Sequence, residues 1–306
     1  MQANAKIGGT AAFARLASAG VSYEHPLAYL IGIEGAALLR AFTGEHDREF
    51  VEARLAEIRA LLADEDLADG VEVTQLAPRD GYARWAAAYD SGENAAFADE
   101  PHVAAILDAI PPGRALDAAC GTGRLTRLLV ERGYHVVAVD GSPEMLSHAK
   151  ADSTFVADLY ELPVDDGSQD VVLCGLALSH VPDLAPVIAE FARVLAPGGH
   201  LVLSDVHPEQ VQRGSIPSVR TADGDPARVR TSHHRVGDYL RAFFAAGLAP
   251  VSCAEPTPAL TEPRQVPGGG PWDLWPWSLN GLVPDALAAA AKDVPSMLIW
   301  HCRKAA

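Results

Sequence analysis

The segment Leu116–Thr126, which reads LDAACGTGRLT, decides the fold. The short run Arg114–Asp117 predicts a buried strand, and the residues from Gly123 onward predict a helix. Glycine at positions 121 and 123 allows a tight turn in which the backbone approaches a ligand closely. In open α/β sheets, ligands bind beyond the carboxyl ends of the strands. The segment therefore predicts an α/β protein with a nucleotide-like ligand at this turn.

Two common nucleotide-binding patterns do not match the turn. A dinucleotide fingerprint, G-x-G-x-x-G, would need glycine at position 126, where the chain has Thr126. The phosphate-binding pattern G-x-x-x-x-G-K followed by Ser or Thr is absent from the sequence. The turn instead offers an acid at the strand end, a small residue and two glycines, in the order Asp117, Ala119, Gly121 and Gly123.

A second acid, Asp140, ends the next predicted strand. A carboxylate there can accept hydrogen bonds from both hydroxyls of a ribose, because it offers two acceptor oxygens. Dinucleotide-binding proteins use an acid at a similar place, so Asp140 alone does not distinguish a dinucleotide site from a site for another ligand that carries a ribose. A third acid, Asp158, follows the third predicted strand. On its own it could also be a helix-capping or solvated turn residue.

Together these motifs resemble the class I S-adenosylmethionine (SAM)-dependent methyltransferases, in the small-molecule group often called type 11. The resemblance covers about residues 80–255, and it departs from many members at Ala119, where they have glycine. It implies SAM as the cofactor and transfer of a methyl group to an O, N or C atom of a small molecule, such as a secondary metabolite. Two alternatives stay open: a SAM-binding protein without methyl transfer, and an NAD(P)-dependent oxidoreductase.

The resemblance also implies roles for individual residues. The glycine-rich turn would cradle the amino acid end of SAM, Asp140 would hold the ribose, and Asp158 would accept a hydrogen bond from the adenine amino group. The end of the fourth strand would border the methionine part. The cofactor-binding residues implied in this way are Asp117, Ala119, Cys120, Gly121, Gly123, Asp140, Gly141, Met145, Ala157, Asp158, Leu159, Cys174, Gly175 and Leu176.

Three aromatic residues lie upstream of the turn. Tyr82, Trp85 and Tyr89 are spaced three and then four apart, so they share one face of a predicted helix. They form either an aromatic core stripe or a lid, in which Tyr82 or Tyr89 would touch the carboxylate of SAM. As a lid, all three would belong to the cofactor site.

Histidines are the best candidates for a general base, because their ordinary pKa lies near neutrality. His180 follows the fourth strand and His234 precedes the helix Val236–Ala246, so we predict these two as catalytic. Substrate contacts are predicted at His207, His233, Trp272 and Trp275. The two tryptophans lie in a Gly- and Pro-rich loop. There they would either stack on a flat substrate or pack the loop against the rest of the protein. No zinc spacing is present, so no metal is predicted.

Short apolar runs alternate with helical patterns from about Ala77 onward, which indicates βαβ units. We predict a Rossmann-like, seven-stranded, mostly parallel sheet with helices on both faces, in a methyltransferase domain of residues 76–306. Residues 1–75 are predicted as a helical extension that serves as a lid or as the contact of a homodimer. The predicted strands are Arg114–Asp117, His135–Val139, Thr154–Val156, Val171–Cys174, His200–Ser204, Val251–Ala254 and Met297–His301. The predicted helices are Pro101–Ile110, Gly123–Arg132, Pro143–Lys150, Leu184–Leu195, Val236–Ala246 and Pro284–Ala291.

Composition limits the partners and the compartment. The formal net charge is −16, with 24 Lys and Arg against 40 Asp and Glu, which disfavours nucleic acid and anionic membranes as partners. The four cysteines form no C-x-x-C pair and are expected to be reduced. The apolar stretch Leu27–Phe42 is shorter than the roughly 20 residues that a membrane span needs, and no secretory signal pattern is found. We therefore expect a cytoplasmic protein that acts on a small molecule.

Overall fold

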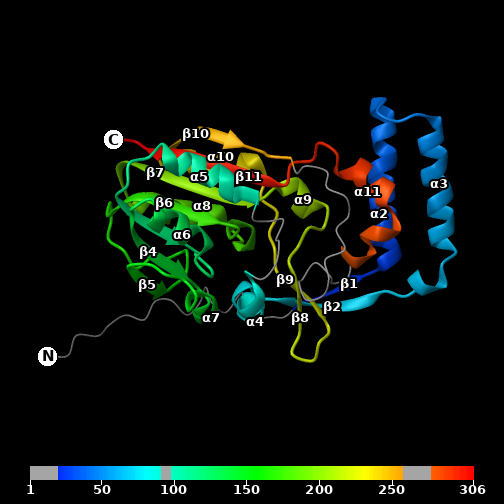
Figure 1. Ribbon diagram of the computed structural model, residues 1–306, viewed down its shortest axis with the longest axis horizontal. Helices are drawn as coiled ribbons and strands as arrows, with labels where there is room; N and C mark the ends of the chain where they lie inside the picture. The colour runs from blue at the N-terminus through cyan, green and yellow to red at the C-terminus, as the bar shows by residue number, and fades with distance from the viewer. Residues whose placement is uncertain (1–19, 91–97, 258–276) are drawn as a thin grey trace.

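A computed structural model describes residues 20–90, 98–257 and 277–306 of the chain (Figure 1). Its main element is a seven-stranded sheet with the strand order β10-β11-β7-β6-β3-β4-β5. Strand β11 is antiparallel to both of its neighbours, and the other neighbouring pairs are parallel. All seven predicted strands are confirmed, as β3 (Arg114–Ala118), β4 (His135–Asp140), β5 (Ser153–Val156), β6 (Gln169–Gly175), β7 (Leu195–Val206), β10 (Leu248–Ala254) and β11 (Met297–Lys304).

Helices cover both faces of this sheet, as predicted. One face packs against α5 (Glu100–Asp108) and α6 (Arg124–Glu131), and the other against α8 (Leu184–Val194) and α10 (Val236–Ala245). The middle residues of the central strands are apolar because both faces of these strands are covered. Side chains along β6 alternate between the two cores: Val171 lies in the first and Val172 in the second.

Two further predicted helices are present, but one is shorter than predicted and the other does not pack on the large sheet. Helix α7 (Pro143–Leu146) is shorter than the predicted Pro143–Lys150, and the chain beyond it forms turns. Helix α11 (Pro284–Ala291) has its predicted bounds, but it packs against α2 (Pro26–Arg40) at the far end of the molecule (Figure 1). Helix α3 (Arg48–Leu62) joins the same cluster, whose core includes Leu30, Leu61 and Val283. Two helices of the predicted N-terminal extension are thus present.

A second sheet was not predicted. It has the order β1-β2-β9-β8 and is made by β1 (Gly20–Glu24), β2 (Val71–Leu76), β8 (Ser218–Arg220) and β9 (Pro226–Val229). Helix α4 (Pro78–Trp85) packs on it through Trp85, which contacts a cluster containing Val219, Ala227 and Val229. The N-terminal region is therefore not helical throughout. Strand β2 is parallel to β9, which is some 150 residues later in the chain, and the sheet lies between the large sheet and the helical cluster (Figure 1).

One described stretch, Pro26–Thr43, is long and apolar enough to cross a membrane by length and composition alone. Only 22% of it is buried inside the structure, so it differs from an ordinary core helix. Glu34 near its middle is fully buried, and an oxygen of its carboxyl group lies 3.8 Å from a guanidinium nitrogen of Arg54 on α3. The stretch therefore carries a buried charge pair near its middle, and the expectation of no membrane partner stays a prediction.

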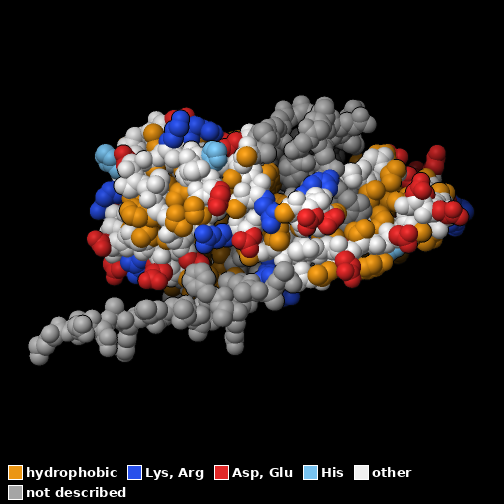
Figure 2. Space-filling model, turned by 90° about the horizontal axis from the view of Figure 1, so that it is seen from below, with side chains coloured by type: hydrophobic (Ala, Val, Ile, Leu, Met, Phe, Trp, Pro, Cys, Tyr) orange, Lys and Arg blue, Asp and Glu red, His pale blue; other side chains and the backbone are white. Residues whose placement is uncertain are grey.

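The surface carries charges of both signs. On the face shown in Figure 2, Asp and Glu side chains are interspersed with Lys and Arg, and acidic groups gather over the end formed by the helical cluster. All four cysteines are free, as expected for reduced thiols, and Cys253 is the exposed one.

Candidate cofactor and active site

A cavity of about 780 Å³ opens at the carboxyl ends of β3, β4, β5 and β6. Residues of α4 and the ends of β2 and β9 close its other side. Every cofactor contact implied by the resemblance lines this cavity except Trp85, Gly123 and Cys174. The turn, the acids and the aromatic helix, which are far apart in the sequence, are thus brought to one place.

The three exceptions have other surroundings. Trp85 lies in the apolar cluster beneath the small sheet. Gly123 caps α6 with φ +90°, and a Cβ there would lie 2.9 Å from Cα of Ala149. Cys174 is fully buried in the core under α8 and α10, and burial raises its pKa well above that of an ordinary thiol. Gly175 is the last residue of β6, and its backbone reaches the cavity where Cys174 does not.

Asp140 is held in one orientation at the edge of the cavity. Its Oδ2 accepts a hydrogen bond of 2.8 Å from the amide of Gly121, and its Oδ1 accepts one of 2.7 Å from the amide of Ser142. Burial raises the pKa of this carboxyl group, and the two amides oppose the rise. A carboxylate has about four lone-pair positions, so each oxygen keeps room for a hydroxyl donor. The geometry suits a ribose diol.

Asp117 lies deeper, at the end of β3, and is only 1% exposed. Its Oδ2 accepts a hydrogen bond of 2.6 Å from the hydroxyl of Thr126, while its buried Oδ1 has no hydrogen-bond partner in the structure. Desolvation raises the pKa of Asp117 to about 7. An unpaired buried acceptor is costly unless a ligand supplies a donor or a positive charge. The ammonium group of SAM is such a ligand group, so this residue fits the cofactor.

Backbone strain is concentrated at the same place. Ala119 and Leu176 both line the cavity, and both have φ +57°, a value that non-glycine residues rarely adopt. They follow β3 and β6, which are neighbours in the sheet. Strained backbone of this kind persists where surrounding structure enforces it, commonly at ligand sites. Asp158 lies at the exposed rim, where its Oδ1 accepts a hydrogen bond of 3.0 Å from the amide of Tyr160.

Tyr82 and Tyr89 line the cavity, whereas Trp85 between them packs into the small-sheet cluster. The aromatic face of this helix therefore contributes both to the core of the small sheet and to the wall of the cavity. The hydroxyl oxygen of Tyr82 lies 2.8 Å from Nε2 of His180, which also lines the cavity. On the opposite side of the ring, Nδ1 of His180 lies 2.8 Å from the carbonyl oxygen of Arg230.

Of the other predicted catalytic or substrate residues, the three histidines that the structure describes do not line the cavity. Nε2 of His234 donates to the carbonyl oxygen of Val181 at 2.6 Å, so it joins two loops. His207 caps α9 (Pro208–Gln212) through Nδ1, and its Nε2 lies 3.0 Å from Glu255. His233 is exposed. Trp272 and Trp275 lie outside the described residues. None of these positions tests the roles predicted from the sequence.

Residues from the small sheet line the cavity without having been predicted: Gln75 and Leu76 end β2, and Arg79 and Arg230 follow β2 and β9. Nothing in the local sequence pointed to them, because they reach the cavity only through the pairing of β2 with β9. Within the described ranges, no group of three or more His, Cys, Asp or Glu could hold a metal ion.

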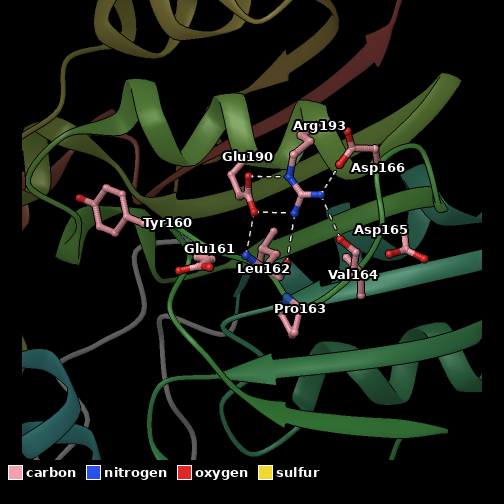
Figure 3. A pocket seen from close by; sticks show the side chains of 9 residues that line it. All are labelled: Tyr160, Glu161, Leu162, Pro163, Val164, Asp165, Asp166, Glu190 and Arg193. Carbon is pink, nitrogen blue, oxygen red and sulfur yellow. Dashed lines mark hydrogen bonds and ion pairs between the residues drawn. The ribbon is translucent and has the colours of Figure 1, made fainter. Parts of the chain in front are cut away.

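A second hollow, of about 630 Å³, lies between α8 and the segment 160–166 (Figure 3). Arg193 is at its centre, and its guanidinium group donates to Glu190, to Asp166 and to the carbonyl oxygens of Leu162 and Val164. A guanidinium has five N–H donors, and these contacts use all five of them. This arginine therefore fastens a loop to α8 and has no donor left for a ligand.

The chain is similar in sequence to known methyltransferases. Residues 116–203 match the family model described as a methyltransferase domain of type 11. An uncharacterized methyltransferase of Mycobacterium tuberculosis is 42% identical over 125 residues, which are 39% of this chain and 51% of that protein. The malonyl-[acyl-carrier protein] O-methyltransferase of Halorhodospira halophila is 35% identical over 171 residues, 51% of this chain and 56% of that protein. The chain thus spans about half the length of the curated relatives it matches.

Solved structures support the fold. The putative methyltransferase of Haloferax volcanii, determined in complex with the Trm112 methyltransferase activator, has a TM-score of 0.54 and 22% identity. The likeness covers 74% of this chain and 97% of that one. Residues 116–203 therefore form a SAM-dependent methyltransferase domain, whose cofactor is SAM. The solved structure supports the fold alone. Together these findings confirm the resemblance, the fold class and the cofactor class predicted from the sequence.

Proposed function

We propose that the protein transfers a methyl group from SAM to an O, N or C atom of a small molecule. The observation that carries this proposal is the fixed Asp140 carboxylate, held by the amides of Gly121 and Ser142 at the edge of the cavity. SAM supplies a methyl group on a positively charged sulfur, ready for displacement. The protein has to align the acceptor atom with that methyl group and keep water away.

The acceptor would occupy the part of the cavity beyond the predicted cofactor contacts. Leu76, Val181 and Pro182 give this part an apolar wall, while Gln75 and Arg230 supply polar groups. Apolar walls with a few polar groups are typical of small-molecule sites. The relatives include proteins named malonyl-[acyl-carrier protein] O-methyltransferase and ubiquinone biosynthesis O-methyltransferase, which supports an oxygen atom as the acceptor.

The test is incorporation of a labelled methyl group. The full chain is incubated with methyl-labelled SAM and a panel of phenols, amines and carboxylic acids, and the labelled products are separated and counted. We expect label in at least one compound, and loss of the label with Asp140→Ala. Tight binding of SAM without transfer to any compound would contradict the proposal and favour a SAM-binding protein that does not transfer methyl groups.

A further inference from the structure

The hydrogen bonds around His180 fix where its proton lies. A carbonyl oxygen can only accept, so Nδ1 of His180 must carry the hydrogen that bonds to Arg230. In the neutral ring, Nε2 then has a lone pair, and the Tyr82 hydroxyl donates to it at 2.8 Å. Burial lowers the pKa of His180, which keeps the ring neutral at pH 7. The tautomer is thus set by the backbone of the residue that follows β9.

The pair lines the cavity, and the residue before His180 is bonded to a buried acid. Tyr82 and His180 both line the cavity, one from α4 and the other from the loop after β6. Next in the chain to His180, Ser179 donates to Asp205 through both its amide, at 2.6 Å, and its hydroxyl, at 2.9 Å. Burial raises the pKa of Tyr82 most, and Tyr89 and Asp205, which is 3% exposed, add to the rise.

We propose that Tyr82 and His180 together accept the proton of a hydroxyl acceptor, so that the methyl acceptor of this protein is an alcohol or a phenol. The inference rests on the proposed function. As the bond from the acceptor oxygen to the methyl carbon forms, the carbon–sulfur bond breaks. The acceptor proton moves to the Tyr82 oxygen, and the Tyr82 proton moves to Nε2 of His180. The products are the methyl ether, the demethylated cofactor and an imidazolium ring.

The chemistry of the pair favours a hydroxyl over a carboxyl acceptor. A carboxylic acid is already ionised at neutral pH and gains nothing from a base, whereas a phenol keeps its proton until late in the reaction. A positioned base of this kind contributes about 10²–10⁴-fold to the rate. His180 cannot reach the acceptor directly through Nδ1, because that nitrogen is bonded to Arg230, so Tyr82 is the group in contact with the acceptor.

The first test needs no acceptor. Histidine ¹⁵N NMR of the full chain with the demethylated cofactor bound should show His180 at pH 7 as the neutral form protonated at Nδ1, with Nε2 free of hydrogen. Resonances are assigned with His180→Gln, and exposed His135 at the start of β4 serves as the comparison, with His135→Gln as its control. An Nε2-protonated or doubly protonated His180 would overturn the inference.

The second test compares two phenols of different acidity. With unsubstituted phenol, Tyr82→Phe and His180→Gln should each lower kcat about 10²-fold. Both phenols are assayed at pH 8.5, where 4-nitrophenol, which is far more acidic, is largely its anion; with this compound both losses should be small. Tyr23→Phe, on exposed β1, is the matched control and should change neither rate. His180→Gln, which lies outside the predicted cofactor contacts, should bind the demethylated cofactor as the parent does, by calorimetry.

The outcomes separate the two claims. Transfer to phenols with equal rates in parent and variants would overturn the inference, and so would transfer to carboxylic acids alone. Transfer to no compound, with SAM still bound, would count against the proposed function itself.

Discussion

The hydroxyl of Thr126 donates a hydrogen bond of 2.6 Å to Oδ2 of Asp117. The residue that excludes a dinucleotide fingerprint therefore has a positive role, because it pairs the buried acid at the end of β3. Replacing Thr126 by Val keeps the shape of the side chain and removes the donor. We expect the free energy of unfolding at pH 8 to fall by about 1–3 kcal/mol, since a buried acceptor loses its partner.

The measurement for Thr126→Val is urea unfolding at constant pH, with Thr126→Ser as the control that keeps the hydroxyl. The serine variant should lie close to the parent. Equal stability of the valine variant and the parent would show that the hydrogen bond has no net value for the fold.

The pKa of Asp117 also predicts a dependence of stability on pH. The ordinary pKa is 3.8 and the folded value is about 7, so the folded state holds its proton over this interval while the unfolded chain releases it. The contribution of Asp117 to the free energy of unfolding therefore falls by on the order of a few kcal/mol as the pH rises from about 4 to about 7.

Asp117→Asn removes this titration. Measured by urea unfolding from pH 4.5 to 7.5, the stability of the variant relative to the parent should increase with pH. Parallel curves for the two proteins would contradict a raised pKa at this site.

The turn that follows β3 predicts effects of different size for two small substitutions. Gly123→Ala places a Cβ 2.9 Å from Cα of Ala149 in a residue with φ +90°, so we expect a loss of about 1–3 kcal/mol in stability. Ala119→Gly relieves a residue at φ +57°, against the greater freedom of glycine in the unfolded chain. The two effects nearly cancel, and thermal unfolding should show a change below about 1 kcal/mol. A larger loss for Ala119→Gly than for Gly123→Ala would refute this description of the turn.

Arg193 provides a test of the loop fastening shown in Figure 3. Arg193→Lys keeps the charge but cannot reproduce the planar set of donors to Glu190 and the loop carbonyls. We expect a loss of about 1–3 kcal/mol in stability, with unchanged affinity for SAM. Weakened SAM binding in a variant as stable as the parent would mean that the second hollow belongs to the ligand site.

The sequence predicted the large sheet well because its signals are local. Buried parallel strands are short apolar runs, and the turns after them carry glycines and acids. The small sheet gave no such signal: β8 has three residues, and β2 pairs with a strand some 150 residues later in the chain. For the same reason the contribution of Arg230 to the cavity could not be predicted.

The surroundings of single residues set the second limit. Cys174 and Gly175 are neighbours in the sequence, yet Cys174 is buried in the core and Gly175, at the end of β6, lines the cavity. His234 and His180 both looked like bases from their positions. Only the folded chain shows that His234 binds a backbone carbonyl, while His180 keeps its Nε2 toward Tyr82 and the cavity.

The central claim is that the cavity at Asp140 binds SAM, and calorimetry tests it most directly. The parent should bind SAM and its demethylated product at one site and should not bind NAD tightly. Asp140→Ala should weaken SAM binding about 10-fold to 100-fold, as expected when hydrogen bonds to a charged group are lost, while the thermal unfolding curve keeps its shape. Unchanged affinity in Asp140→Ala, or tight NAD binding without SAM binding, would contradict the account.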